Sequence, residues 1–90
     1  MSVDLKILLF GPARDAMNGA ASACVVVDEI PLPLSLLRER LVTQYPQLRF
    51  VLMNAIFAYQ NKLVPKIEES VVIVDNLSSE IILIPPVSGG

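Results

Sequence analysis

Histidine is absent from this chain of 90 residues, and cysteine occurs once, at Cys24. General acid–base catalysis near neutral pH and most zinc sites depend on imidazole, so neither a self-contained hydrolase nor a zinc site is expected. A single cysteine excludes an internal disulfide, which fits a reducing compartment and makes the cytoplasm the expected location. Chemistry that involves this chain is therefore expected to use residues of a partner, with the chain alone non-catalytic.

Charge is also scarce. Seven basic and nine acidic residues give a net charge of −2, and the basic residues form no run, which argues against nucleic-acid binding through phosphates. No apolar run reaches the 18 or so residues of a spanning helix, and the first residues lack a signal-peptide layout, so no membrane role is expected. Yet 53% of the residues are hydrophobic and the mean hydropathy is +0.59, so part of the apolar surface is expected to meet a partner protein.

Patterns of apolar residues predict five strands, at residues 3–10, 24–27, 55–59, 71–74 and 80–84. The first two are expected to pair antiparallel around a short helix at residues 13–17, closed by Asn18 and Gly19. The last strand does not alternate, which is typical of a strand buried on both faces and therefore central. Residues 63–64 are expected to form only an edge piece.

One main helix is expected between residues 33 and 45, where the apolar period becomes helical. Its inward residues follow the spacing i, i+3, i+7 and i+11, at Leu34, Leu37, Leu41 and Tyr45. Its solvent side is expected to carry Arg38, Glu39, Arg40 and Gln44. Pro46 ends the helix, and a weaker helical segment follows at residues 47–53. The order of elements predicts an α+β domain with a mixed five-stranded sheet and one main helix on one face, the ubiquitin-like β-grasp arrangement.

The domain is expected to span residues 1–84, and residues 85–90 to leave the middle of the sheet as an extended tail. The tail consists of Pro85, Pro86, Val87, Ser88, Gly89 and Gly90. Its prolines lack backbone donors, and its glycines lack side chains, so a partner's narrow channel could enclose the terminal carboxylate. Joining that carboxylate to AMP makes it reactive towards sulfur or an amine, which gives a thiocarboxylate or a conjugate.

The other candidate groups have plainer interpretations. Cys24 lies in an apolar strand with no basic residue near it in sequence to activate it, so it is expected to be a buried structural thiol. The acidic pairs at 28–29 and 68–69 have no metal-ligand spacing and are interpreted as solvated loop residues. The basic residues are interpreted as single surface charges. The carboxylate of Gly90 is therefore the expected functional group.

Three segments together resemble a known family: residues 3–14, the strand Ala-Ile-Phe-Ala-Tyr at 55–59 followed by Asn61, and the Ile-Pro-Pro-Val-Ser-Gly-Gly end at 84–90. They are similar to the small subunit of molybdopterin synthase, a ubiquitin-like sulfur carrier, and the resemblance spans essentially the whole chain. The proline-containing end is its most specific part. One departure is Ser-Ser-Glu at 78–80, where many relatives have Gly-Asp-Glu.

The resemblance implies a specific chemistry. An E1-like enzyme would adenylate Gly90 with ATP, and a sulfurtransferase would convert the adenylate to a thiocarboxylate, with no cofactor bound permanently. The tail would then enter the large synthase subunit and donate sulfur to cyclic pyranopterin monophosphate, which forms molybdopterin. Two small and two large subunits would make the assembly, with the open sheet face as the interface.

Several alternatives stay open. The chain could be a sulfur carrier for thiamine synthesis or tRNA thiolation, or a ubiquitin-like modifier of lysines. A different class is a non-catalytic β-grasp interaction module with an inert tail.

Overall fold

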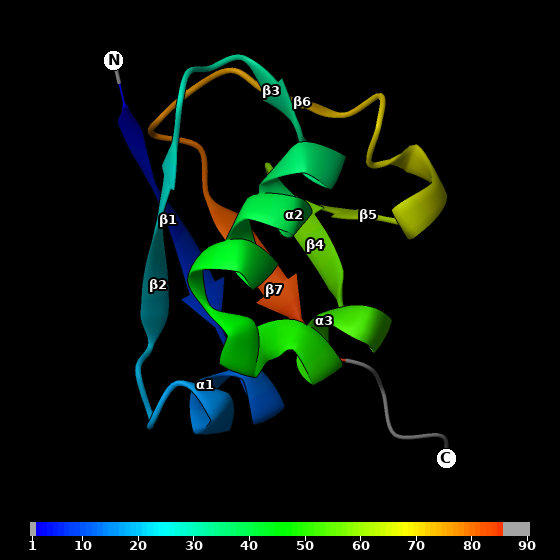
Figure 1. The fold of residues 1–90 in the computed structure, drawn as a ribbon. Coiled ribbons are helices and arrows are strands. Elements are labelled where there is room, and N and C mark those ends of the chain that lie inside the picture. Colours follow the sequence, from blue (N-terminus) through cyan, green and yellow to red (C-terminus); the bar gives the residue numbers. More distant parts are fainter. Residues whose placement is uncertain (1, 86–90) are drawn as a thin grey trace.

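The structure, a computed structural model, describes residues 2–85 (Figure 1). Its helices and strands in chain order are β1 (Val3–Leu9), α1 (Pro12–Ala16), β2 (Ser22–Val27), β3 (Leu32–Pro33), α2 (Leu34–Gln44), the 3-10 helix η1 (Pro46–Leu48), α3 (Arg49–Asn54), β4 (Ile56–Tyr59), β5 (Lys62–Val64), the 3-10 helix η2 (Lys66–Glu68), β6 (Ile73–Val74) and β7 (Ile81–Ile84). The main sheet has the strand order β2-β1-β7-β4-β5, and β3 pairs separately with β6. Within the described residues, no helix is long and apolar enough to cross a membrane.

The first two strands pair antiparallel, as predicted, with Leu5 opposite Val25. Both alternate between a buried side and an exposed side, because only one face of this part of the sheet is covered. The short helix α1 joins them and ends in Asn18 and Gly19, whose φ angles are 58° and 85°. The Gly19 N–H donates to the Arg14 carbonyl, 2.7 Å away, which closes the helix end as the sequence predicted.

The last strand is central. It runs parallel to β1, with Ile81 opposite Ile7, and antiparallel to β4, with Leu83 opposite Phe57. Ile81 and Leu83 are buried, whereas Ile82 and Ile84 on the other side are only half-buried. The predicted central position is confirmed, but the prediction that both faces of this strand are buried is wrong, since no helix between residues 2 and 85 covers its second face.

The main helix α2 lies across one face of the sheet (Figure 1). Leu34, Leu37 and Leu41 are fully buried beneath it, as their spacing predicted. Gln44 is exposed, as predicted, and its side-chain amide also donates to the Val26 carbonyl and accepts from the Val26 N–H at 2.9 Å. This side chain therefore occupies backbone groups at the free edge of β2, which limits pairing with another strand.

The predicted membership of the sheet needs one correction. Of residues 71–74, only Ile73–Val74 forms a strand, and β6 pairs with β3 outside the main sheet. The fifth strand is instead β5, which the sequence predicted as an edge piece only. Gln60 and Asn61, with φ angles of 53° and 65°, form the tight turn that folds β5 back along β4.

Candidate functional site

The base of the predicted tail lies at the end of the central strand. Pro85 follows β7 directly and is half-buried. It lies against the turn after β1, so that a Cβ added to Gly11 would be 3.4 Å from Cγ of Pro85. Gly11 has φ 54° and ψ −129°, and the N–H of Ala13 donates to the Phe10 carbonyl across the turn at 3.2 Å. Only glycine adopts this backbone conformation easily, so the turn depends on the absence of a side chain.

The rest of the predicted functional tail lies outside the described residues. This applies to Pro86, Val87, Ser88, Gly89 and Gly90. Their extended conformation and the chemistry of the Gly90 carboxylate stay predictions.

The uncovered face of the main sheet carries an apolar row that crosses four strands. Register places Leu8 beside Ile82, Ile82 beside Ala58, and Ala58 beside Leu63. Leu8 and Ile82 are half-buried, Ala58 is buried, and Leu63 at the β5 edge is 64% exposed. Such an unpaired apolar surface on a small domain marks a place where a partner can bind.

The prediction that Cys24 is a buried thiol is wrong, because Cys24 is exposed. The buried side of β2 is made by its neighbours Ala23 and Val25, so the thiol projects from the uncovered face, and its partner across the β1–β2 pair is Lys6. The compact apolar sequence around Cys24 hid this alternation, because every residue from 23 to 27 is apolar.

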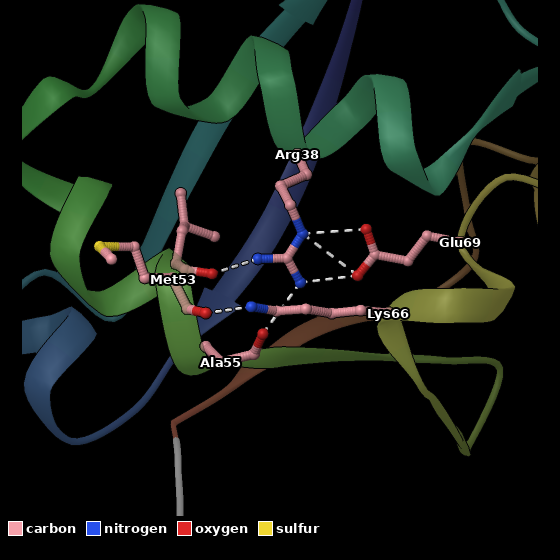
Figure 2. Close-up of polar contacts among 6 residues, drawn as sticks. Arg38, Met53, Ala55, Lys66 and Glu69 are labelled. Carbon is pink, nitrogen blue, oxygen red and sulfur yellow. Dashed lines mark hydrogen bonds and ion pairs between the residues drawn. The ribbon is translucent and has the colours of Figure 1, made fainter.

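The prediction that Arg38 and Glu69 are solvated is also wrong, because the two side chains form an enclosed ion pair. Figure 2 shows the guanidinium of Arg38 facing the carboxylate of Glu69. Arg38 Nη2 lies 2.6 Å from Glu69 Oε2, and Nε lies 2.9 Å from Oε1. Their side chains are only 17% and 4% exposed. The sequence did contain a signal, because Arg38 lies four residues after Leu34 and three before Leu41, on the inward face of the helix.

This ion pair joins elements that are far apart in the chain. Arg38 also donates to the carbonyls of Leu52 and Ala55 at the end of α3, the latter at 2.9 Å, and its guanidinium lies 5.1 Å from the Phe57 ring centroid. Those carbonyls have no partners within the helix, so the guanidinium satisfies them. The pair thereby connects α2, the end of α3 and the segment after η2, and its geometry indicates a structural role.

The remaining charged candidates do not form a metal site. Asp28 lies 3.4 Å from Arg40 and its side chain is 89% exposed, which confirms the interpretation of Asp28 as a solvated loop residue. Among residues 2–85, no group of three or more cysteine, aspartate and glutamate side chains could hold a metal ion.

Solved structures resemble this fold over nearly all of their length. Small archaeal modifier protein 1 from Haloferax volcanii matches with a TM-score of 0.72 and 20% identity, over 98% of this chain and 100% of that chain. The protein of that name from Methanosarcina acetivorans matches with a TM-score of 0.71 and 20% identity, over 100% and 99%. A chain in the complex of subunits 1 and 2 of the molybdopterin-converting factor from Helicobacter pylori matches with a TM-score of 0.63 and 19% identity, over 98% and 100%.

No protein-family model and no curated protein sequence matches this chain. At about 20% identity, the structural matches show a common fold. The ubiquitin-like β-grasp fold predicted from the sequence is thus confirmed.

Proposed function

We propose that this protein is a ubiquitin-like sulfur carrier whose reactive group is the carboxylate of Gly90. An activating enzyme joins the carboxylate to AMP and releases pyrophosphate from ATP. A sulfur donor then displaces AMP, so that one terminal oxygen is replaced by sulfur. The thiocarboxylate passes this sulfur to an acceptor, and no cofactor stays on the chain.

The observation that carries the proposal is the position of β7. This strand is hydrogen-bonded on both sides, to β1 and to β4, and leads directly into Pro85. A tail that delivers its end into another protein binds better from a rigid base, because less conformational freedom is lost on binding. The fold likeness to a chain of the molybdopterin-converting factor complex supports the same interpretation.

We assign the acceptor system to molybdopterin synthesis. In this proposal the chain is the small subunit of a molybdopterin synthase and donates sulfur to cyclic pyranopterin monophosphate in the large subunit's active site. The support is the Pro-Pro-Val-Ser-Gly-Gly end together with the likeness to the Helicobacter pylori complex. The apolar row on the open face is the proposed contact with the large subunit, in a tetramer of two small and two large subunits.

Protein modification is the second candidate. The likeness to two proteins named as archaeal modifiers favours it, with TM-scores of 0.71 and 0.72. In this case a lysine amine, not sulfur, displaces AMP from Gly90. Sulfur carriers for thiamine synthesis or tRNA thiolation use the same first step.

Intact-mass measurement of the full chain tests the carrier proposal. After incubation with ATP, an E1-like activating enzyme and a persulfide-bearing sulfurtransferase, we expect the mass increase of one sulfur replacing one oxygen. A variant that lacks Gly90 is the matched control and stays unchanged. An unchanged full chain, with an activating enzyme competent on its own substrate, contradicts the carrier function.

Reconstitution then identifies the acceptor. Thiocarboxylated chain is mixed with a large synthase subunit and cyclic pyranopterin monophosphate, and molybdopterin is measured. Product formation supports the synthase assignment. Conjugates on lysines of a cell extract, with no molybdopterin, support the modifier instead.

A further inference from the structure

A groove lies on the side of the molecule that the helices cover, away from the apolar row. It has a volume of about 460 Å³ and is lined by side chains of α2, α3 and η2 and the residue that follows η2, namely Arg38, Val42, Arg49, Leu52, Met53, Lys66 and Glu69. Figure 2 shows part of this surface, with Arg38, Lys66 and Glu69 converging from different elements. A volume of this size accommodates several side chains of a bound segment.

The groove is positively charged on a chain whose net charge is −2. Three of the seven basic side chains line it, and its one acidic side chain, Glu69, is already paired with Arg38. Lys66 donates to the carbonyl of Met53, which is a neutral acceptor, so its ammonium charge is not compensated. Arg49 is exposed and forms no ion pair with any residue between 2 and 85. Two cations are thus available to a ligand.

The same surface is apolar between its charges. Val42 and Leu52 form part of the lining, and Met53 is 60% exposed. Two residues that follow lining residues in sequence are also exposed, Phe50 on α3 at 79% and Ile67 on η2 at 88%. Large apolar side chains so exposed next to a groove are typical of a surface that another protein covers.

We propose that this groove binds an extended segment of a partner protein in which apolar side chains are followed by carboxylates. The apolar side chains contact Val42, Leu52 and Met53, and the carboxylates lie against Arg49 and Lys66. The two uncompensated positive charges among the apolar side chains select a segment that is both apolar and acidic.

This inference goes beyond sulfur transfer and does not depend on it. The groove lies among the helices, whereas the apolar row lies on the uncovered face of the sheet. A partner in the groove would therefore leave the open face accessible. The protein could bind an acidic segment and a second protein at the same time.

A nuclear magnetic resonance titration of the full chain tests the proposal. The probe is a synthetic peptide with blocked ends that has leucines followed by aspartates, and the matched control peptide has asparagines in place of the aspartates. We expect amide shifts confined to α2, α3 and η2, binding about five to ten times tighter for the acidic peptide, and weaker binding at high salt.

Charge reversal locates the site. Arg49→Glu is the cleanest variant, because Arg49 has no described ion-pair partner to lose, and we expect it to weaken acidic-peptide binding about fivefold or more. The matched control Lys6→Glu reverses a charge on the open face and should leave binding unchanged. A peptide with lysines in place of the aspartates should bind Arg49→Glu better than the unaltered chain.

Four results would overturn the proposal. Equal binding of the acidic and neutral peptides would show that the carboxylates are not recognised, and amide shifts outside the groove would show that the peptide binds elsewhere. Amide shifts that depend on protein concentration in the absence of peptide would assign the groove to a second copy of the chain. Binding of anionic lipid vesicles through the same residues, without peptide binding, would assign it to a membrane surface.

Discussion

The two faces of the main sheet both carry apolar side chains but differ in what covers them. On the covered face, Ile7, Phe57 and Leu83 are fully buried in one core with the inward leucines of α2. On the open face, Leu63 is 64% exposed and Val26 is 45% exposed. One part of the chain's hydrophobicity is therefore used in folding, and the other part remains available for a partner.

The two ion pairs differ in the same way. Arg38 and Glu69 are enclosed and share several hydrogen bonds, whereas Arg40 and Asp28 meet at 3.4 Å in solvent. Water screens the second pair but is largely excluded from the first. The position of an ion pair relative to the helices, and not the residue types in it, therefore decides how much the pair contributes to the stability of the fold.

The largest effect is expected from breaking the enclosed pair. Glu69→Ala leaves Arg38 without its carboxylate in a partly buried site, and we expect the free energy of unfolding to fall by about 3–5 kcal/mol. Asp28→Ala, the matched change in the exposed pair, should cost less than about 1 kcal/mol. Urea denaturation followed by circular dichroism measures both. Equal losses would contradict the proposed difference between the pairs.

Neighbouring residues of β7 test the two faces directly. Leu83→Ala removes a fully buried side chain, and we expect a loss of about 2–5 kcal/mol. Ile82→Ala, one residue away on the open face, should lower the free energy of unfolding by about 1 kcal/mol, because the Ile82 side chain is only half-buried and already contacts water. Chemical denaturation gives both values, and similar losses would show that the open face is as important to folding as the covered one.

A smaller effect is expected at the boundary between the sheet and the tail. Gly11→Ala places a Cβ at a positive φ and close to Pro85, and we expect a loss of about 1–3 kcal/mol. Gly19→Ala is the matched control, since its φ is also positive but no atom lies within 4 Å of the added Cβ. Because the added Cβ of Gly11→Ala contacts Pro85, this variant should shift the Pro85 resonances in nuclear magnetic resonance spectra, and Gly19→Ala should leave them unchanged.

The smallest effect on stability is expected at Cys24. Cys24→Ser should change the free energy of unfolding by less than about 0.5 kcal/mol, because the side chain is exposed. In the native chain, iodoacetamide should alkylate Cys24 readily. A cysteine moved to the covered side, in the double variant Cys24→Ser with Val25→Cys, should be protected until the chain unfolds. A protected Cys24 would restore the prediction of a buried thiol.

Local sequence patterns predicted most helices and strands, because the formation of a helix or strand depends mainly on residues that are close in sequence. The alternation in β1 and the inward leucines of α2 follow from strand and helix periods, and the central place of the last strand follows from its apolar run. Residues 71–74 were assigned to the wrong sheet, because a short apolar run does not indicate which strand it pairs with. That pairing depends on the tight turn after β4 and on contact with β3.

The sequence by itself therefore determined the fold class, the Gly-Gly end and the resemblance that suggests sulfur transfer. Only the tertiary structure decided which polar residues are enclosed and which apolar residues stay in solvent. Arg38 is enclosed because α3 and the segment after η2 close over it, and Cys24 is exposed because no helix in the described part of the chain covers the second face of β2. Such burial depends on contacts between residues that are far apart in the chain. The helical and strand periods of a local segment carry no information about these contacts.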